Sequence, residues 1–224
     1  MKPLKNFPRF LPADLRATVF IAMFVLLLAA LPLLLPEQSF RYAFSEEGPF
    51  ERLSVIGWIT TALIVLARIR PFGFRAGAFA LVCLLFAMRE ADLHKAFTAD
   101  SILKSNYYKH AIAPLGEKLV AGIVAIASIA LIVYIGFVVL RFLFLHGGWR
   151  SRSGFWLLFG TMLVLLGKML DRAPAVLSEE YGIVLSPLVG HYAVAFEEGL
   201  EMIHPLILAW SAWISQRERR YLSP

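Results

Sequence analysis

Cysteine, charge and internal repeats are all scarce in this chain of 224 residues. Its one cysteine, Cys83, lies in an apolar run, so an internal disulfide framework and a two-cysteine redox relay are excluded. Charged residues make up 17% of the chain, whereas soluble domains average about 25%. No glycine-rich phosphate loop and no internal repeat is visible. The lack of a repeat argues against the transporters that are built from two inverted halves.

Long apolar runs dominate instead. Hydrophobic residues make up 59% of the chain and its mean hydropathy is +0.69. Runs of roughly 18–25 residues recur, which is the length that a helix needs to cross a hydrocarbon core of ~30 Å. We predict a single all-α integral membrane domain over residues 1–224, a bundle of six transmembrane helices. The predicted spans are residues 18–35, 50–69, 76–93, 119–145, 155–170 and 190–214.

The first span follows several basic residues, as a signal peptide does. We predict that it stays uncleaved, because Pro32 and Pro36 are followed by Glu37 without a small-residue cleavage site.

The distribution of charge predicts the orientation of the spans. Thirteen of the 22 basic residues lie in the termini and in alternate connections, where the acids are only Asp14 and Glu218. Basic residues gather on the cytoplasmic side of a membrane, so both termini are predicted to be cytoplasmic, in a bacterial inner (plasma) membrane. The basic residues behind the net charge of +6 then set the orientation of the spans. We expect membrane lipids, not nucleic acid, as partners.

The last predicted span carries the most unusual residues of the chain: Glu197, Glu198, Glu201 and His204. A charge at the centre of a bilayer costs at least ~2.5–3.5 kcal/mol, so such groups are expected to be buried and partnered. At 100° per residue, Glu197, Glu201 and His204 fall on one narrow stripe of the helix. Glu201 and His204 also have the i, i+3 spacing by which one helix offers two ligands to a metal.

Other charged residues lie near the outward ends of other predicted spans. Around the end of the third span, Glu90 and His94 are i, i+4 neighbours, and Arg89 and Asp92 could pair at i, i+3. The other charged residues near the outward ends of predicted spans are Glu51, Lys168, Asp171 and Arg172. We therefore predict a buried site of glutamate, histidine, arginine and lysine side chains that opens toward the periplasmic side.

One chemistry that fits these residues is a metal-dependent hydrolase or transferase acting on a lipid or lipid-linked substrate. Histidine and carboxylate ligands suit zinc, iron or manganese, and a divalent metal lowers the pKa of bound water toward ~7. The predicted metal ligands are Glu51, Glu90, His94, Glu201 and His204. The predicted catalytic residues are Glu197 and Glu198, with Glu198 as general base. The predicted substrate-binding residues are Arg89, Lys168, Asp171 and Arg172.

Two other hypotheses remain open. Pairs such as Glu198–Arg89 and Glu201–Lys168 could titrate in a small transporter or a proton- or cation-conducting protein. The same charges could instead form a structural ion-pair network in a non-catalytic membrane scaffold.

Three blocks of sequence resemble a group of uncharacterised bacterial inner-membrane proteins. They are Glu-Glu-Gly-Pro-Phe-Glu at 46–51, the Arg-Glu-x-Asp-x-His-Lys block at 89–95 and the Glu-Glu-x-x-Glu block at 197–201. The resemblance spans about residues 45–205 and implies that the blocks occur together, but it implies no activity. The chain differs from the membrane hydrolases of the alkaline ceramidase and adiponectin receptor superfamily, which bind zinc within seven helices. The chain lacks their seventh helix and their His-x-x-x-His pair, so their zinc ligands are not transferred.

Overall fold

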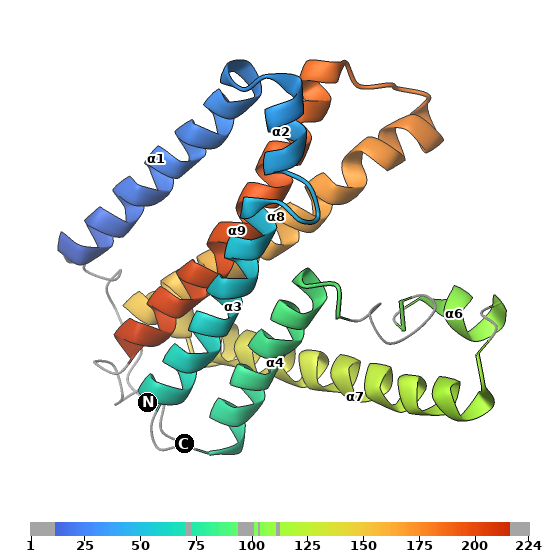
Figure 1. Cartoon of the computed structure of the whole chain (residues 1–224). Coiled ribbons are helices and arrows are strands. Elements are labelled where there is room, and N and C mark those ends of the chain that lie inside the picture. The colour runs from blue at the N-terminus through green and yellow to red at the C-terminus, as the bar shows by residue number, and fades with distance from the viewer. Residues whose placement is uncertain (1–11, 70–72, 94–100, 103, 111–112, 216–224) are drawn as a thin grey trace.

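A computed structural model describes residues 12–69, 73–93, 101–102, 104–110 and 113–215, and within them all regular structure is helical. The predicted all-α fold is thus confirmed. The α-helices are α1 (Pro12–Leu34), α2 (Glu37–Ala43), α3 (Pro49–Arg68), α4 (Phe74–Glu90), α6 (Ser105–His110), α7 (Leu115–Leu140), α8 (Arg152–Tyr181) and α9 (Pro187–Ser215) (Figure 1). A π turn (Arg141–Leu145) extends α7, and a short 3₁₀ turn (Gly148–Arg150) leads into α8.

Among the described residues, four helices are long and apolar enough to cross a membrane: α1, α3, α8, and α7 with its extension to Leu145. The chain is therefore a multi-pass helical membrane protein. The other two predicted spans also form helices, α4 and α9. Helix α4 has only 17 residues, and the glutamates of α9 lower its hydropathy.

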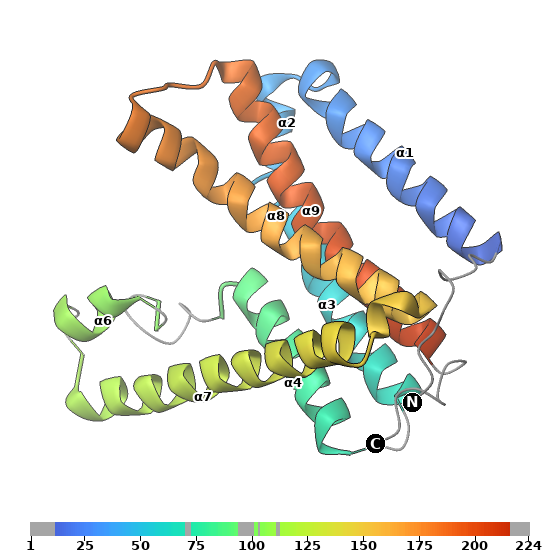
Figure 2. The same cartoon turned by 180° about the vertical axis from the view of Figure 1, so that it is seen from behind.

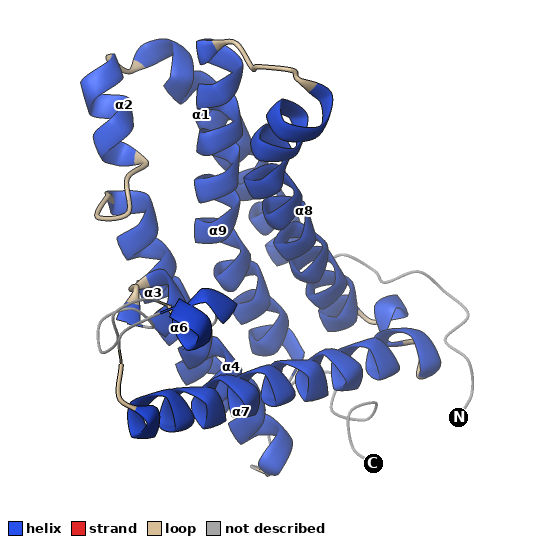
Figure 3. Cartoon of the chain, turned by 90° about the vertical axis from the view of Figure 1, so that its right-hand side faces the viewer, coloured by secondary structure: helices blue, strands red, loops and turns tan. Residues whose placement is uncertain are grey.

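Helix α9 is the centre of the architecture (Figures 1 and 2). It packs against α8, α3 and α1, and α4 packs against α3. The absence of a side chain at Gly199 lets α1 approach, because a Cβ atom there would lie 2.3 Å from Cδ1 of Leu28. Helix α7 lies at the edge, crossing the direction of α8 and α9 (Figure 3). Since α7 is apolar on all sides, its sequence does not select one face for burial.

The helix that contains the fifth predicted span is longer than that span. Helix α8 continues past residue 170 to Tyr181 and includes Pro174. It ends at Gly182, which adopts the left-handed conformation (φ 65°), while the N–H of Ile183 donates to the carbonyl of Leu177. This is the usual glycine-dependent helix stop. Asp171, which we placed at the end of a span, therefore lies inside a helix.

A buried ion pair fixes the first turn of α1. The Asp14 side chain is fully buried and accepts hydrogen bonds from Nε of Arg152 and from Nε1 of Trp156, both on α8. A buried carboxylate persists only when it is paired and hydrogen-bonded in this way.

Pro205 interrupts the hydrogen bonding of α9 just after the acidic cluster. Proline has no N–H, so the carbonyl four residues earlier, that of Glu201, loses its partner within the helix. The hydroxyl of Ser54 on α3 donates to that carbonyl at 3.0 Å. The Thr61 hydroxyl lies 2.7 Å from both the Pro205 carbonyl and the Gly57 carbonyl. Ser54 thus satisfies the carbonyl that the proline exposes, as membrane proteins require, and Thr61 makes a second contact between α3 and the backbone of α9.

We predict that Ser54→Ala lowers the free energy of unfolding by about 1–3 kcal/mol, because it leaves a buried carbonyl without a donor. In a Pro205→Ala background the helix regains its N–H, so Ser54→Ala should then be nearly neutral. The measurement is reversible unfolding in mixed micelles. Ser178→Ala, at an exposed hydroxyl that bonds within α8, is the control. An equal effect of Ser54→Ala in both backgrounds would contradict this account.

Candidate functional site

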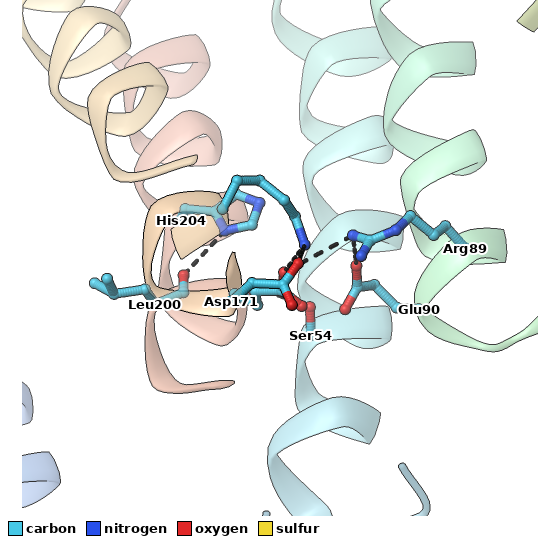
Figure 4. A network of polar contacts seen from close by, with 8 residues as sticks. Ser54, Arg89, Glu90, Asp171, Leu200 and His204 are labelled. Carbon is cyan, nitrogen blue, oxygen red and sulfur yellow. Dashed lines mark hydrogen bonds and ion pairs between the residues drawn. The ribbon is translucent and has the colours of Figure 1, made fainter. Parts of the chain in front are cut away.

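Charged side chains from three helices meet around the middle of α9 (Figure 4). Glu201 lies at their centre. Its Oε1 is 2.7 Å from Nζ of Lys168 on α8 and 3.8 Å from Nη1 of Arg89 on α4. The same Arg89 nitrogen donates to Oε1 of Glu90 at 3.0 Å. The network thus ties α4, α8 and α9 together through one carboxylate.

The anions of this network are buried and the cations are not. The side chains of Glu90 and Glu201 are 6% and 13% exposed, whereas those of Arg89 and Lys168 are 40% and 42% exposed. Long basic side chains place their apolar stems against the protein and keep the charged head near solvent. Breaking the pair from the cation side would therefore leave the carboxylates buried without compensation.

Further carboxylates surround Glu201. Glu198 lies close enough to Glu201, Glu197, Glu51 and Glu90 for their charges to act on it. Glu197 contacts Asp171, which is also 3.4 Å from Nζ of Lys168. Within the described part of the chain, six carboxylates thus share two cations. Like charges at such distances cannot all stay ionised unless protons or cations compensate them.

His204 presents a buried, unsatisfied nitrogen beside this cluster. His204 is 6% exposed, and its Nδ1 lies 2.9 Å from the carbonyl oxygen of Leu200. A carbonyl can only accept, so Nδ1 carries the hydrogen and Nε2 of the neutral ring is a bare lone pair. Nε2 has no hydrogen-bond partner among the described residues. The edge contact with Trp58, with ring centroids 4.8 Å apart, holds the ring in place.

Most of the predicted site residues are brought together. Glu51, Arg89, Glu90, Lys168, Asp171, Glu197, Glu198 and Glu201 form the charged cluster, with His204 next to it. Arg172 is exposed on α8, and no ion pair joins it to the cluster among the residues that the structure describes. His94 lies outside the described residues.

Two expected pairings differ from the structure. The Glu201–Lys168 pair is present, but Arg89 bonds to Glu90 and approaches Glu201 instead of pairing with Glu198. Arg89 and Asp92 do not share a helical face. Helix α4 ends at Glu90, and Asp92 has a positive φ of 52°. The i, i+3 rule assumed a helix that had already ended.

The described residues alone do not form a metal site. In the described ranges, no group of three or more histidine, cysteine, aspartate or glutamate side chains is arranged to hold a metal ion. The ligand set proposed from the sequence includes His94, which is not described, so metal binding stays a prediction.

Sequence reasoning missed Ser54 and Trp58 as parts of the site. A signal for Ser54 was available, because a proline four residues after Glu201 requires an outside donor for the Glu201 carbonyl. Nothing in the sequence marks Trp58, whose contact with His204 depends on how α3 and α9 are rotated.

Comparison with known proteins does not assign the chain to a family. No family model matches the chain, and no curated protein or solved structure matches it significantly. The function must therefore be argued from the site itself.

Proposed function

We propose that this chain is a six-span protein of the bacterial inner membrane, with both termini cytoplasmic, and an acid–base enzyme that acts on a lipid-type substrate. In this proposal α4 and α9 cross the membrane along with the four long apolar helices. At 1.5 Å per residue, the 17 residues of α4 reach about 26 Å, close to the ~30 Å hydrocarbon core. The main objection to α9 as a membrane span is the cost of its charged side chains in the bilayer. Ion pairs with Arg89 and Lys168 reduce that cost.

The orientation can be tested with single cysteines in a Cys83→Ser background. We predict that cysteines at Glu47 and Glu180, both exposed, react with a membrane-impermeant maleimide in intact cells, and that one at His146 reacts only after lysis. If only the four long apolar helices crossed, His146 would face outward and Glu180 inward. Labelling in that reversed pattern would refute six spans.

The charge composition of the site carries the proposed chemistry. Half-exposed cations, a buried carboxylate that anchors both of them and surplus carboxylates are what an acid–base site needs. In the proposed step, Glu198 removes a proton from a nucleophilic water or hydroxyl, which attacks an ester or phosphoryl centre of the lipid. The leaving group takes its proton from the second carboxyl, Glu197. Arg89 and Lys168 hold the anionic oxygens of the substrate.

A purely structural network fits these residues less well. Glu201 with Arg89 and Lys168 would by itself join three helices. Glu197 and Glu198 add Coulomb repulsion to Glu201 and to each other, which works against the stability of such a network. Groups that reduce stability in this way are typical of functional sites inside membranes.

We predict that Glu198→Gln lowers turnover by about 10²–10⁴-fold, the range for loss of a general base. The assay is mass spectrometry of lipid species produced in liposomes of bacterial polar lipids that contain the purified protein. Glu179→Gln, an exposed position on α8 outside the cluster, is the matched control and should be active. Lipid profiles identical to those of protein-free liposomes would overturn the enzymatic proposal.

A transporter is the second candidate, and the surplus of carboxylates favours it. Proton uptake by the same liposomes, lost in Glu201→Gln while the lipid profile stays constant, would support transport over catalysis.

A metal-bound form of the enzyme has one specific observation in its favour, the bare Nε2 of His204. It predicts about one equivalent of zinc, iron or manganese in the purified protein, and loss of that metal in His204→Ala. Elemental analysis is the measurement. Protein that carries no metal, and whose turnover is unaffected by a chelator, would leave the metal-free acid–base mechanism in place.

A further inference from the structure

An apolar groove runs between α4 and α7. The two helices touch where Ala78 and Val82 of α4 pack against Ile135 and Val139 of α7. Beyond this contact they diverge, and a cavity of about 620 Å³ opens between the second half of α4 and the stretch of α7 from Gly116 to Ile132. Its volume is within the ~300–1,000 Å³ of small-molecule sites.

The groove has an apolar body and one charged end. Its walls are mainly aliphatic and aromatic and include Phe86, Val120, Val124 and Ile132. From Gly116 to Ile132 the lining follows α7 for about 24 Å at 1.5 Å per residue. Arg89 and Glu117 lie in the lining near the ends of their helices. Such a shape matches a hydrocarbon chain with a polar group at one end.

Arg89 connects the groove to the charged site. Its side chain lines the groove while its guanidinium bonds to Glu90 and lies 3.8 Å from Glu201. The other charged lining residue, Glu117, accepts a hydrogen bond from the hydroxyl of Tyr107 at 2.6 Å. A molecule in the groove therefore ends at a cation that has surplus carboxylates directly behind it.

We propose that this groove binds an acyl chain of a zwitterionic phospholipid with a primary amine, its phosphate against Arg89 and its ammonium against the carboxylates. Charge complementarity selects this occupant. An anionic head group would meet the surplus negative charge behind Arg89. A wholly apolar molecule would cover the remaining donors of Arg89 without offering them an acceptor. The inference names the substrate class of the proposed enzyme and so rests on that proposal.

The test is native mass spectrometry of the full-length protein with dioleoyl phosphatidylethanolamine and dioleoyl phosphatidylglycerol. Wild-type protein should retain the ethanolamine lipid at least tenfold better. Val124→Trp, which fills the groove, should lower that binding at least tenfold. Val133→Trp is the matched control, because Val133 is exposed on α7 but lies outside the lining. Thermal melting of both variants tests whether the fold is kept. Arg89→Gln should abolish the head-group preference.

Equal binding of the two lipids by wild-type protein, or equal binding by the two tryptophan variants, would overturn the proposal. The failures of the two proposals can be told apart. Groove-dependent lipid binding without any turnover rejects the enzyme and keeps the groove. Normal turnover in Val124→Trp rejects the groove and keeps the enzyme.

Discussion

The missing N–H of Pro205 is the constraint on which the arrangement of the site depends. It exposes the carbonyl of Glu201, and only a donor from another helix can satisfy that carbonyl inside a membrane. Ser54, Gly57 and Thr61 lie on one face of α3, at the i, i+3 and i+7 positions. Ser54 and Thr61 supply hydroxyls, and Gly57 lets the proline ring approach, because a Cβ there would lie 3.0 Å from the ring. One residue of α9 thus fixes both the register and the rotation of α3.

The position of the other charges follows from that register. Glu51 comes three residues before Ser54, and Glu198 comes three residues before Glu201, so the glutamates at 51 and 198 come close together at the same level. Helix α4 packs on α3 and brings Arg89 and Glu90 to this level at its end. In surroundings of low dielectric these charges interact strongly. Two half-exposed cations offset part of the negative charge, and the remainder is what a proton, a cation or an ammonium group would compensate.

The sequence was informative where a pattern is local. The stripe formed by Glu197, Glu201 and His204 follows from helical periodicity alone, and the apolar runs located every long helix to within a few residues at most ends. Predictions failed where they depended on the residue at which a helix ends or on how one helix packs against another. Helix α8 passed through Pro174 to Gly182, and α4 stopped at Glu90, before Asp92 could join its face. The partner of Arg89 depends on how helices rotate against each other, which periodicity does not contain.

Arg89 also explains why the groove and the charged cluster should be considered together. If the only role of residue 89 were to neutralise the carboxylates, a lysine would provide the same charge. A guanidinium has five donors in a plane, so it can hold Glu90 and approach Glu201 while part of it still faces α7. The side chain of Arg89 is 40% exposed and lines the apolar groove. Among the described lining residues, the other polar side chains are Glu117, which is bonded to Tyr107, and Ser128. The remaining donors of Arg89 are therefore the groups that the phosphate of the proposed lipid would satisfy.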